Sequence, residues 1–260
     1  MGFFKPVLSY SKEFLPSLTS GPLVITGTNT TSFGTWNSLG TTPSGFATKR
    51  IKFFVGQSVN GYNSWIDVGM GASSSQVSFG IYMQSSEMSI NEFEFPIEVP
   101  PNTDLWARAA SYSAASPQIA LILYPDSDDL PSILPGSSIG IQISNVTTGF
   151  TLTPSGTSGV PGSWVYLGQT TNDMNRFYAY QSGSNGYGLF FGYDIGLGSS
   201  ASSSPTNVLD SGFMCTSSGY SSINGHVSHK THIPIGSFVW ARCTLWSTST
   251  ATISFCLFGA

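Results

Sequence analysis

Three histidines recur at every third position late in the chain, as His226, His229 and His232. Imidazole is a frequent metal ligand, and three such groups at one point could hold a transition metal. On a strand, however, the first and third would point to one face and the second to the other, and no carboxylate lies within ten residues of them. Two interpretations stay open: an exposed polar loop, which we favour, and a metal site on the symmetry axis of an oligomer.

Other motifs that resemble catalytic signatures lack the context that the chemistry needs. Residues 136–140 read Gly-Ser-Ser-Ile-Gly, but a nucleophile elbow needs a helix after its serine, and a strand-like sequence follows here. The Asp-x-Gly-x-Gly segments that begin at Asp67 and Asp194 lack the third glycine and the helix of a phosphate-binding loop. No arrangement of histidine with serine or cysteine, and no pair of carboxylates, suggests acid–base catalysis. The sequence therefore indicates a protein that is not an enzyme and that needs no cofactor.

A row of aromatic and arginine side chains occurs twice, on strands whose other face is apolar. In the strand from Leu105 the alternation directs Leu105, Ala107 and Ala109 to one side, which we assign to the core. The opposite side suits cation–π stacking and burial against another sheet or subunit, because arginine loses less on desolvation than lysine. We therefore predict an interface there, formed by Trp106, Arg108, Tyr112, Trp240, Arg242 and Trp246.

These two rows belong to an internal duplication. The segment 99–108 matches 233–242 at an offset of 134 residues, with Trp-Ala-Arg in common, and the apolar strands 119–124 and 253–258 match at the same offset. Upstream, 66–71 matches 193–198, and Trp36 followed by Leu-Gly matches Trp164 followed by Leu-Gly. Landmarks that recur in the same order predict two modules of one fold.

Each module reads as short strands separated by turns. In the first copy we expect strands at about 22–26, 47–55, 62–70, 76–83, 92–99, 104–112 and 118–124. This spacing predicts an all-β chain of two tandem β-sandwich modules with a jelly-roll-like fold. We place an N-terminal arm at 1–19, which could also be an extra strand, module one at 20–125, a linker at 126–136 and module two at 137–260. Asn-Gly pairs at 60–61 and 185–186 predict hairpins, as does the final strand pair of each module.

Composition agrees with this fold and excludes several partners. Only 8% of residues are charged, whereas 40% are hydrophobic, and serine and threonine together number 68 of 260. A net charge of −4 with scattered basic residues gives no footprint for nucleic acid, and no segment approaches 18 uninterrupted apolar residues. Three cysteines fit assembly in a reducing host cytoplasm, and we read no export signal. We therefore expect neither nucleic acid nor membrane as a partner.

Two motifs carry a resemblance to a known group of proteins. The first is Asp-Val/Ile-Gly-Met/Leu-Gly before a loop rich in serine and alanine. The second is Ile-Pro-Ile-Gly-Ser-Phe-Val-Trp-Ala-Arg at 233–242, from which module one departs by Pro101 and Asn102. This pattern resembles repeats in tailed-bacteriophage virion proteins. The resemblance implies a surface component of the virion, and no catalytic residues accompany it.

We therefore expect a structural protein that decorates or extends a phage capsid or tail as an oligomer, with a homotrimer as the first expectation. Its partners would be other copies of itself and further virion proteins. The apolar residues Phe3, Phe4, Phe14 and Leu15 of the predicted arm are anchor candidates. The alternative is a tail-fibre or baseplate adhesin that binds host surface glycan through Tyr62, Trp65 and Tyr187.

Overall fold

The computed structural model describes residues 12–17, 20–26, 32–57, 64–85, 90–111, 116–125, 132–133, 138–140, 149–184, 189–215, 226–247 and 251–259. These residues form strands and their connections and contain no helix, so the predicted all-β fold class is confirmed. Within these ranges, no helix is present that would be long and apolar enough to cross a membrane.

Module one is a sandwich of two antiparallel sheets. Its first sheet contains, in spatial order, β1 (Glu13–Leu15), β9 (Pro117–Tyr124), β4 (Arg50–Gln57) and β7 (Asn91–Phe95), with β2 (Leu23–Val24) also paired to β9. Its second sheet contains β3 (Asn37–Thr41), β8 (Asp104–Ser111), β5 (Ser64–Met70) and β6 (Val77–Ser85).

Module two repeats this arrangement strand for strand. Its first sheet contains β10 (Ser138–Ile139), β18 (Ile253–Gly259), β13 (Phe177–Ser184) and β16 (His226–His229), with β11 (Phe150–Leu152) paired to β18. Its second sheet contains β12 (Val165–Gln169), β17 (Phe238–Leu245), β14 (Phe190–Gly198) and β15 (Asp210–Cys215). In each module the chain crosses repeatedly between a five-stranded and a four-stranded antiparallel sheet, which is a jelly-roll-like arrangement, and the chain contains two of them in tandem.

This topology corrects the predicted hairpins. The strands β8 and β9, like β17 and β18, lie in different sheets, and so do β4 and β5 on either side of the Asn-Gly pair at 60–61. The Asn-Gly pairs themselves lie outside the described residues. These connections cross from one layer to the other because a jelly roll places many of its consecutive strands on opposite sheets, which turn signals alone do not reveal. Hydrogen-bonded hairpins occur instead at β5–β6 and β14–β15.

Pairing registers show how closely the copies correspond. A register shift interrupts β3 between Ser38 and Gly40 and β12 between Tyr166 and Gly168, and both glycines have positive φ. Phe54 pairs with Ala120 as Tyr180 pairs with Cys256, so the last strands match at an offset of 136 residues rather than 134. The β17–β18 connection is two residues longer than the β8–β9 connection, which accounts for the difference.

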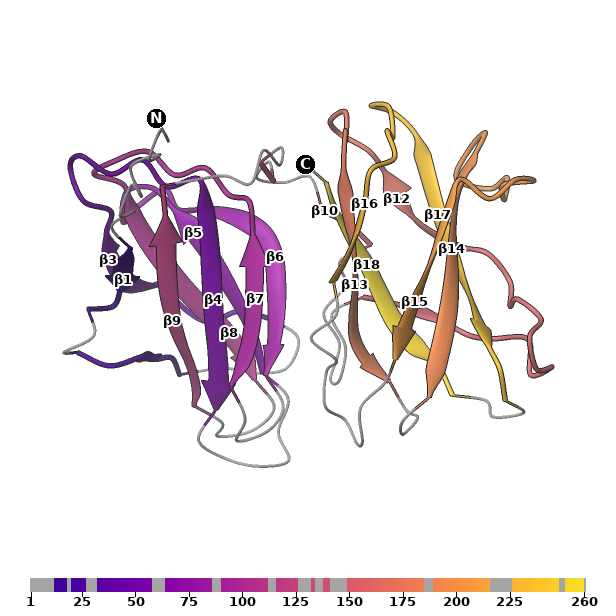
Figure 1. Cartoon of the computed structure of the whole chain (residues 1–260), viewed down its shortest axis with the longest axis horizontal. Helices are drawn as coiled ribbons and strands as arrows, with labels where there is room; N and C mark the ends of the chain where they lie inside the picture. The colour runs from indigo at the N-terminus through magenta and orange to yellow at the C-terminus, as the bar shows by residue number, and fades with distance from the viewer. Residues whose placement is uncertain are drawn as a thin grey trace, which may run out of the picture.

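The two modules lie side by side and share a hydrophobic core (Figure 1). In β13 and β18, Phe177 and Leu257 point into module two, whereas Tyr178, Tyr180 and Phe258 join the core cluster of module one. The ring centroids of Phe93 and Tyr180 are 6.0 Å apart, and Phe95 lies 5.9 Å from Tyr178 and 6.1 Å from Phe258. The strand β18 and residues 177–180 of β13 are therefore buried on both faces of the sheet.

The N-terminal segment differs from the predicted arm in the part that the structure describes. Residues Glu13–Leu15 form β1 and pair with Leu121–Leu123 of β9, as Ser138–Ile139 pair with β18 in module two. Leu15 packs against the core of module one, so it and Phe14 belong to the sandwich rather than to a free anchor. Phe3 and Phe4 lie outside the described residues. Of the predicted linker, residues 132–133 are described, and Ile133 is buried in the same core. The domain boundaries stay predictions.

The shared core predicts that the modules unfold together. Phe258→Ala removes a ring that is 1% exposed and lies between the modules. We expect a loss of about 3–5 kcal/mol and two calorimetric transitions in place of one, because each module then opens separately. Leu257→Ala, on the same strand but facing the core of module two alone, is the matched control and should lower stability while one transition is kept. An unchanged single transition in Phe258→Ala would contradict the shared core.

Candidate interaction surfaces

The predicted arginine of module one lies in a network on the outer face of the second sheet. Arg108 of β8 donates from Nε to Oδ2 of Asp67 on the neighbouring strand β5, at 2.8 Å. Its guanidinium carbon is 4.2 Å from the ring centroid of Trp36 and 4.9 Å from that of Phe33. Ser78 donates its hydroxyl to the other carboxylate oxygen of Asp67 at 2.5 Å. The charge of Arg108 is thus balanced and stacked within its own module.

Module two repeats the arginine, aspartate and tryptophan of the network at equivalent positions, with a serine at a different position of the neighbouring strand. Arg242 donates to Asp194 at 2.8 Å and stacks on Trp164 at 4.4 Å, and Ser211 donates to Asp194 at 2.8 Å. The two arginine side chains keep 27% and 25% of their surface exposed, but the carboxylates differ: Asp67 is fully buried and Asp194 is 20% exposed. The structure therefore gives both arginines a role inside their modules, and a subunit contact through them stays a prediction.

The other interface candidates occupy three different environments. Trp106 is half-buried and donates its indole N–H to the carbonyl of Gly71 at 2.7 Å. Trp240 is 8% exposed, and its ring lies 5.3 Å from that of Tyr166. Trp246 is 50% exposed, whereas Tyr112 lies outside the described residues. The described residues of the predicted interface therefore do not form one continuous surface in the structure.

Burial sets the ionisation of Asp67. Removal from water raises the pKa of this carboxyl to about 6, although the hydrogen bond from Ser78 and the charge of Arg108 act in the opposite direction. Ser78 and Arg108 both lower the pKa of Asp67, and without either of them the buried carboxylate would lose a partner for its charge. Both residues thus help to keep Asp67 ionised at neutral pH.

His229 and His232 have different surroundings, and His229 lies buried on β16 (His226–His229), so the predicted exposed loop is wrong for this residue. His229 is 6% exposed, and both of its ring nitrogens have partners: Nε2 lies 2.6 Å from the hydroxyl of Tyr193, and Nδ1 lies 3.0 Å from Asp210. His232 is exposed and lies 3.8 Å from Asp173. His226 pairs with Tyr180 through the backbone, three positions before His229 on β16. Among the described residues, no group of three or more histidines, cysteines or carboxylates could hold a metal ion.

The two cysteines whose side chains are described are buried, and the serine of the Gly-x-Ser-x-Gly match lies in a strand. Burial raises the pKa of the Cys243 thiol to about 12 and raises that of Cys256 as well, so both stay protonated at neutral pH. Ser138 of the Gly-x-Ser-x-Gly match belongs to β10, which pairs with β18. A strand replaces the strand-turn-helix that a nucleophile elbow requires.

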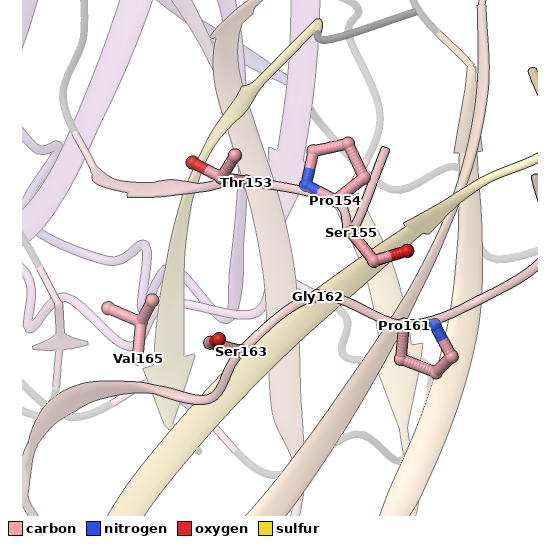
Figure 2. A pocket seen from close by; sticks show the side chains of 7 residues that line it. All are labelled: Thr153, Pro154, Ser155, Pro161, Gly162, Ser163 and Val165. Atoms are coloured by element: carbon pink, nitrogen blue, oxygen red, sulfur yellow. The ribbon is translucent and has the colours of Figure 1, made fainter. Parts of the chain in front are cut away.

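A groove in module two offers hydroxyl groups and apolar surface but no titratable group. The volume of this groove is about 520 Å³. Figure 2 shows the residues that line it: Thr153, Pro154, Ser155, Pro161, Gly162, Ser163 and Val165. Because none of these side chains can take up or release a proton near neutral pH, the groove provides neither acid–base chemistry nor strong metal ligands.

The glycan candidates are not brought together by the described structure. Trp65 is fully buried, so it cannot offer a ring face to a sugar, and its assignment as a glycan contact is wrong. The strand β5 is buried at six successive positions, on both of its faces, which the alternation of a half-exposed strand does not predict. Tyr62 and Tyr187 lie outside the described residues.

An exposed aromatic cluster on module two was missed by the sequence reasoning, except for Trp246. Phe190 is 56% exposed and Phe213 is 61% exposed, and the Phe213 ring lies 6.1 Å from Phe190 and 5.6 Å from Trp246. Trp246 covers Gly192, where a Cβ would lie 2.6 Å from its ring. We call Phe190, Phe213 and Trp246 the aromatic cluster. Three large exposed rings in contact are a common signature of an interaction site.

The comparisons with known proteins give structural matches with low TM-scores and low sequence identity. No protein-family model matches the sequence, and no curated protein matches it. A chain in the cryo-EM structure of Broad Bean Stain Virus is 10% identical with a TM-score of 0.41, covering 100% of this chain and 94% of that chain. Tripeptidyl Peptidase 2 is 8% identical with a TM-score of 0.30, over 97% of this chain and 23% of that chain. The CBM22-1-CBM22-2 tandem domain from Paenibacillus barcinonensis is 10% identical with a TM-score of 0.26, over 92% and 91%. No function is transferred from these structures to this chain.

Unequal burial of the two carboxylates predicts unequal effects of removing the arginines. Arg108→Ala leaves the fully buried Asp67 without its cation and should lower the free energy of unfolding by about 3–5 kcal/mol at pH 7. Arg242→Ala leaves the partly solvated Asp194 and should cost about 1 kcal/mol. Urea unfolding of both variants measures the difference, and equal losses would refute this account of the network.

The raised pKa of Asp67 also allows a prediction of how the stability of the fold depends on pH. Its folded-state pKa of about 6 lies above the ordinary value of 3.8, so between these pH values the folded chain binds more protons than the unfolded chain. The free energy of unfolding should therefore rise as the pH falls through this window, by up to about 3 kcal/mol from this group. Urea titrations at pH 7 and pH 4.5 should show the rise in the wild type and its loss in Asp67→Asn. Asp194→Asn should retain the rise, and a wild type whose pH dependence matches that of Asp67→Asn would contradict the assignment.

Proposed function

We propose that the chain is a non-enzymatic structural protein of a bacteriophage virion, which decorates or extends the capsid or tail as a homo-oligomer. The observation that carries the proposal is the shared core: Phe93 and Phe95 of one jelly roll pack on Tyr178, Tyr180 and Phe258 of the other. Two jelly rolls joined in this way form a rigid block, which suits a component that must keep its shape in a particle. The tailed-phage motifs in the sequence supply the assignment to a phage.

The surface chemistry supports a role in assembly rather than catalysis. Serine and threonine provide most of the polarity, and 8% of the residues are charged. Lys49, Arg50 and Lys52 on module one are already paired with Glu98, Glu94 and Glu92. The electrostatic attraction of such a surface for the phosphates of nucleic acid is weak. Its partners would instead bind through hydrogen bonds and apolar contacts.

The segment before β1 is the proposed attachment to the particle. Because β1 fixes Glu13–Leu15 in the sandwich, the anchor is narrowed to the residues before it, with Phe3 and Phe4 as its apolar contacts. Three copies would present three such segments to the virion. The host cytoplasm is the proposed place of assembly.

Removal of residues 1–11 tests this role directly. The truncated chain should fold with an unchanged melting temperature, because β1 is kept, but it should be absent from purified particles made by a phage that carries the truncation. Antibody labelling and cryo-EM of wild-type particles should locate the full-length protein on the surface. Phe3→Ser with Phe4→Ser is the matched substitution and should reduce incorporation in the same way.

Incorporation of the truncated chain at the wild-type level would refute the anchor. Absence of the full-length protein from intact particles would refute the virion role itself. The adhesin alternative keeps Tyr62 and Tyr187 as its glycan candidates, and a glycan array probed with the intact chain would test it. Binding that survives loss of both tyrosines would exclude them as the contacts.

A further inference from the structure

The aromatic cluster lies on the outer face of the second sheet of module two, beside the arginine network of that module. The strands β17, β14 and β15 are neighbours in this sheet (Figure 1), and Gly192 of β14 pairs with Phe213 of β15. Two positions further along β14, Asp194 pairs with Arg242 on one side and with Ser211 on the other. Residues two apart on a strand share a face and lie about 7 Å apart, so the rings and the polar network form one surface.

Module one shows that the shared fold does not require exposed rings at this place. At the positions of Gly192 and Phe213, the strand register of module one puts Trp65 and Gln84. Trp65 is fully buried, whereas Gly192 has no side chain and leaves room for the Trp246 ring to lie directly on the sheet. The glycine and the exposed rings therefore belong to a specialised feature of module two.

The polar groups beside the rings are also more open in module two than in module one. Asp194 is 20% exposed, whereas Asp67 is fully buried. The guanidinium of Arg242 stacks on one ring, and that of Arg108 stacks on two. In the described part of the chain, Arg242 donates one hydrogen bond, from Nε to Asp194, so its other N–H groups and lone pairs of the carboxylate stay available.

A neutral oligosaccharide matches both parts of this surface. A pyranose ring has an apolar C–H face that stacks on an aromatic ring, and hydroxyl groups along its edge that donate and accept hydrogen bonds. The planar donors of Arg242 and the acceptors of Asp194 suit adjacent hydroxyls, and their opposite charges leave no excess that would favour an anion. An apolar protein surface would instead cover these two groups without meeting their hydrogen-bonding capacity, which costs free energy.

We propose that this face of module two binds a neutral oligosaccharide: one sugar ring stacks on the aromatic cluster, and a neighbouring sugar hydrogen-bonds to Arg242 and Asp194. The site is distinct from Tyr62 and Tyr187, the glycan candidates from the sequence, which lie outside the described residues. The inference goes beyond the proposed structural role and does not depend on it, because it concerns a ligand of the purified chain.

The first measurement asks whether the intact chain binds a saccharide at all. The probe is an array of neutral gluco-, manno- and galacto-oligosaccharides, and we expect binding to at least one of them. That oligosaccharide is then titrated into the wild type and the variants by calorimetry, and the melting temperature of each variant is compared with that of the wild type.

Substitutions that keep apolar surface but remove a ring separate sugar stacking from a general apolar contact. Phe213→Leu and Trp246→Leu should each weaken binding about tenfold with an unchanged melting temperature, because a leucine has no ring face for the sugar. Phe213→Tyr keeps the ring and should bind like the wild type. A partner protein held by apolar burial would be little affected by the leucines.

Three further variants test the rest of the site and provide the control. Gly192→Ala should also weaken binding, because its Cβ would lie 2.6 Å from the Trp246 ring and displace it. Arg242→Lys keeps the charge beside Asp194 but loses the planar donors, and binding should fall about threefold. Ile235→Ala removes a side chain that is 61% exposed and precedes β17, whereas Trp246 follows that strand, so it should bind like the wild type.

A chain that binds no neutral oligosaccharide on the array would overturn the inference, and so would wild-type affinity in Phe213→Leu and Trp246→Leu. Self-association that these two variants lose, measured by light scattering together with an empty array, would assign the cluster to a contact between copies and overturn it as well. Labelling of particles decides the virion role separately, because a protein absent from particles could still bind the sugar, and one present on them could fail to bind it.

Discussion

The first sheet of module two has to be apolar on both faces, and this requirement connects the two halves of the molecule. Tyr178, Tyr180 and Phe258 could not remain in water at such density without association, and module one removes them from solvent by packing Phe93 and Phe95 against them. The same requirement explains why duplicated positions diverged. At the site of Phe95, module two has His229, whose two ring nitrogens have partners within their own module, Tyr193 and Asp210.

The second sheets differ from the first because their outer faces carry large aromatic rings beside the solvent. In both modules an arginine covers one of these rings: it donates a hydrogen bond to an aspartate on the next strand and stacks on a tryptophan near the start of the module. The arrangement ties separate strands together through one side chain. Its repetition in both copies favours a structural role, whereas the aromatic cluster of module two has no described counterpart in module one and so favours a specialised one.

Much of the architecture could be predicted from local patterns. The strand expected at 104–112 is β8 at Asp104–Ser111, and its alternation assigned Leu105, Ala107 and Ala109 to the core, where all three are buried. The short strand β3 was not predicted, and for the segment that contains β1 an extra strand was only an alternative to an arm, because three or five residues with little alternation give no periodic signal. The Asp–Arg–Trp network could not be derived, since its three members lie far apart in sequence and meet only through sheet order. The contact between modules had one signal, the run Phe-Tyr-Ala-Tyr in β13, which is apolar at every position and therefore typical of a strand buried on both sides.

Hydrogen exchange of the intact chain measures the shared core most directly. The relevant amides are those of β4 at the centre of module one and of β13 at the centre of module two. If the modules hold one core between them, both sets should exchange with the same opening free energy, equal to that of global unfolding. Two distinct values, separated by more than about 2 kcal/mol and each shared by one module, would show that the jelly rolls open independently and would contradict the account.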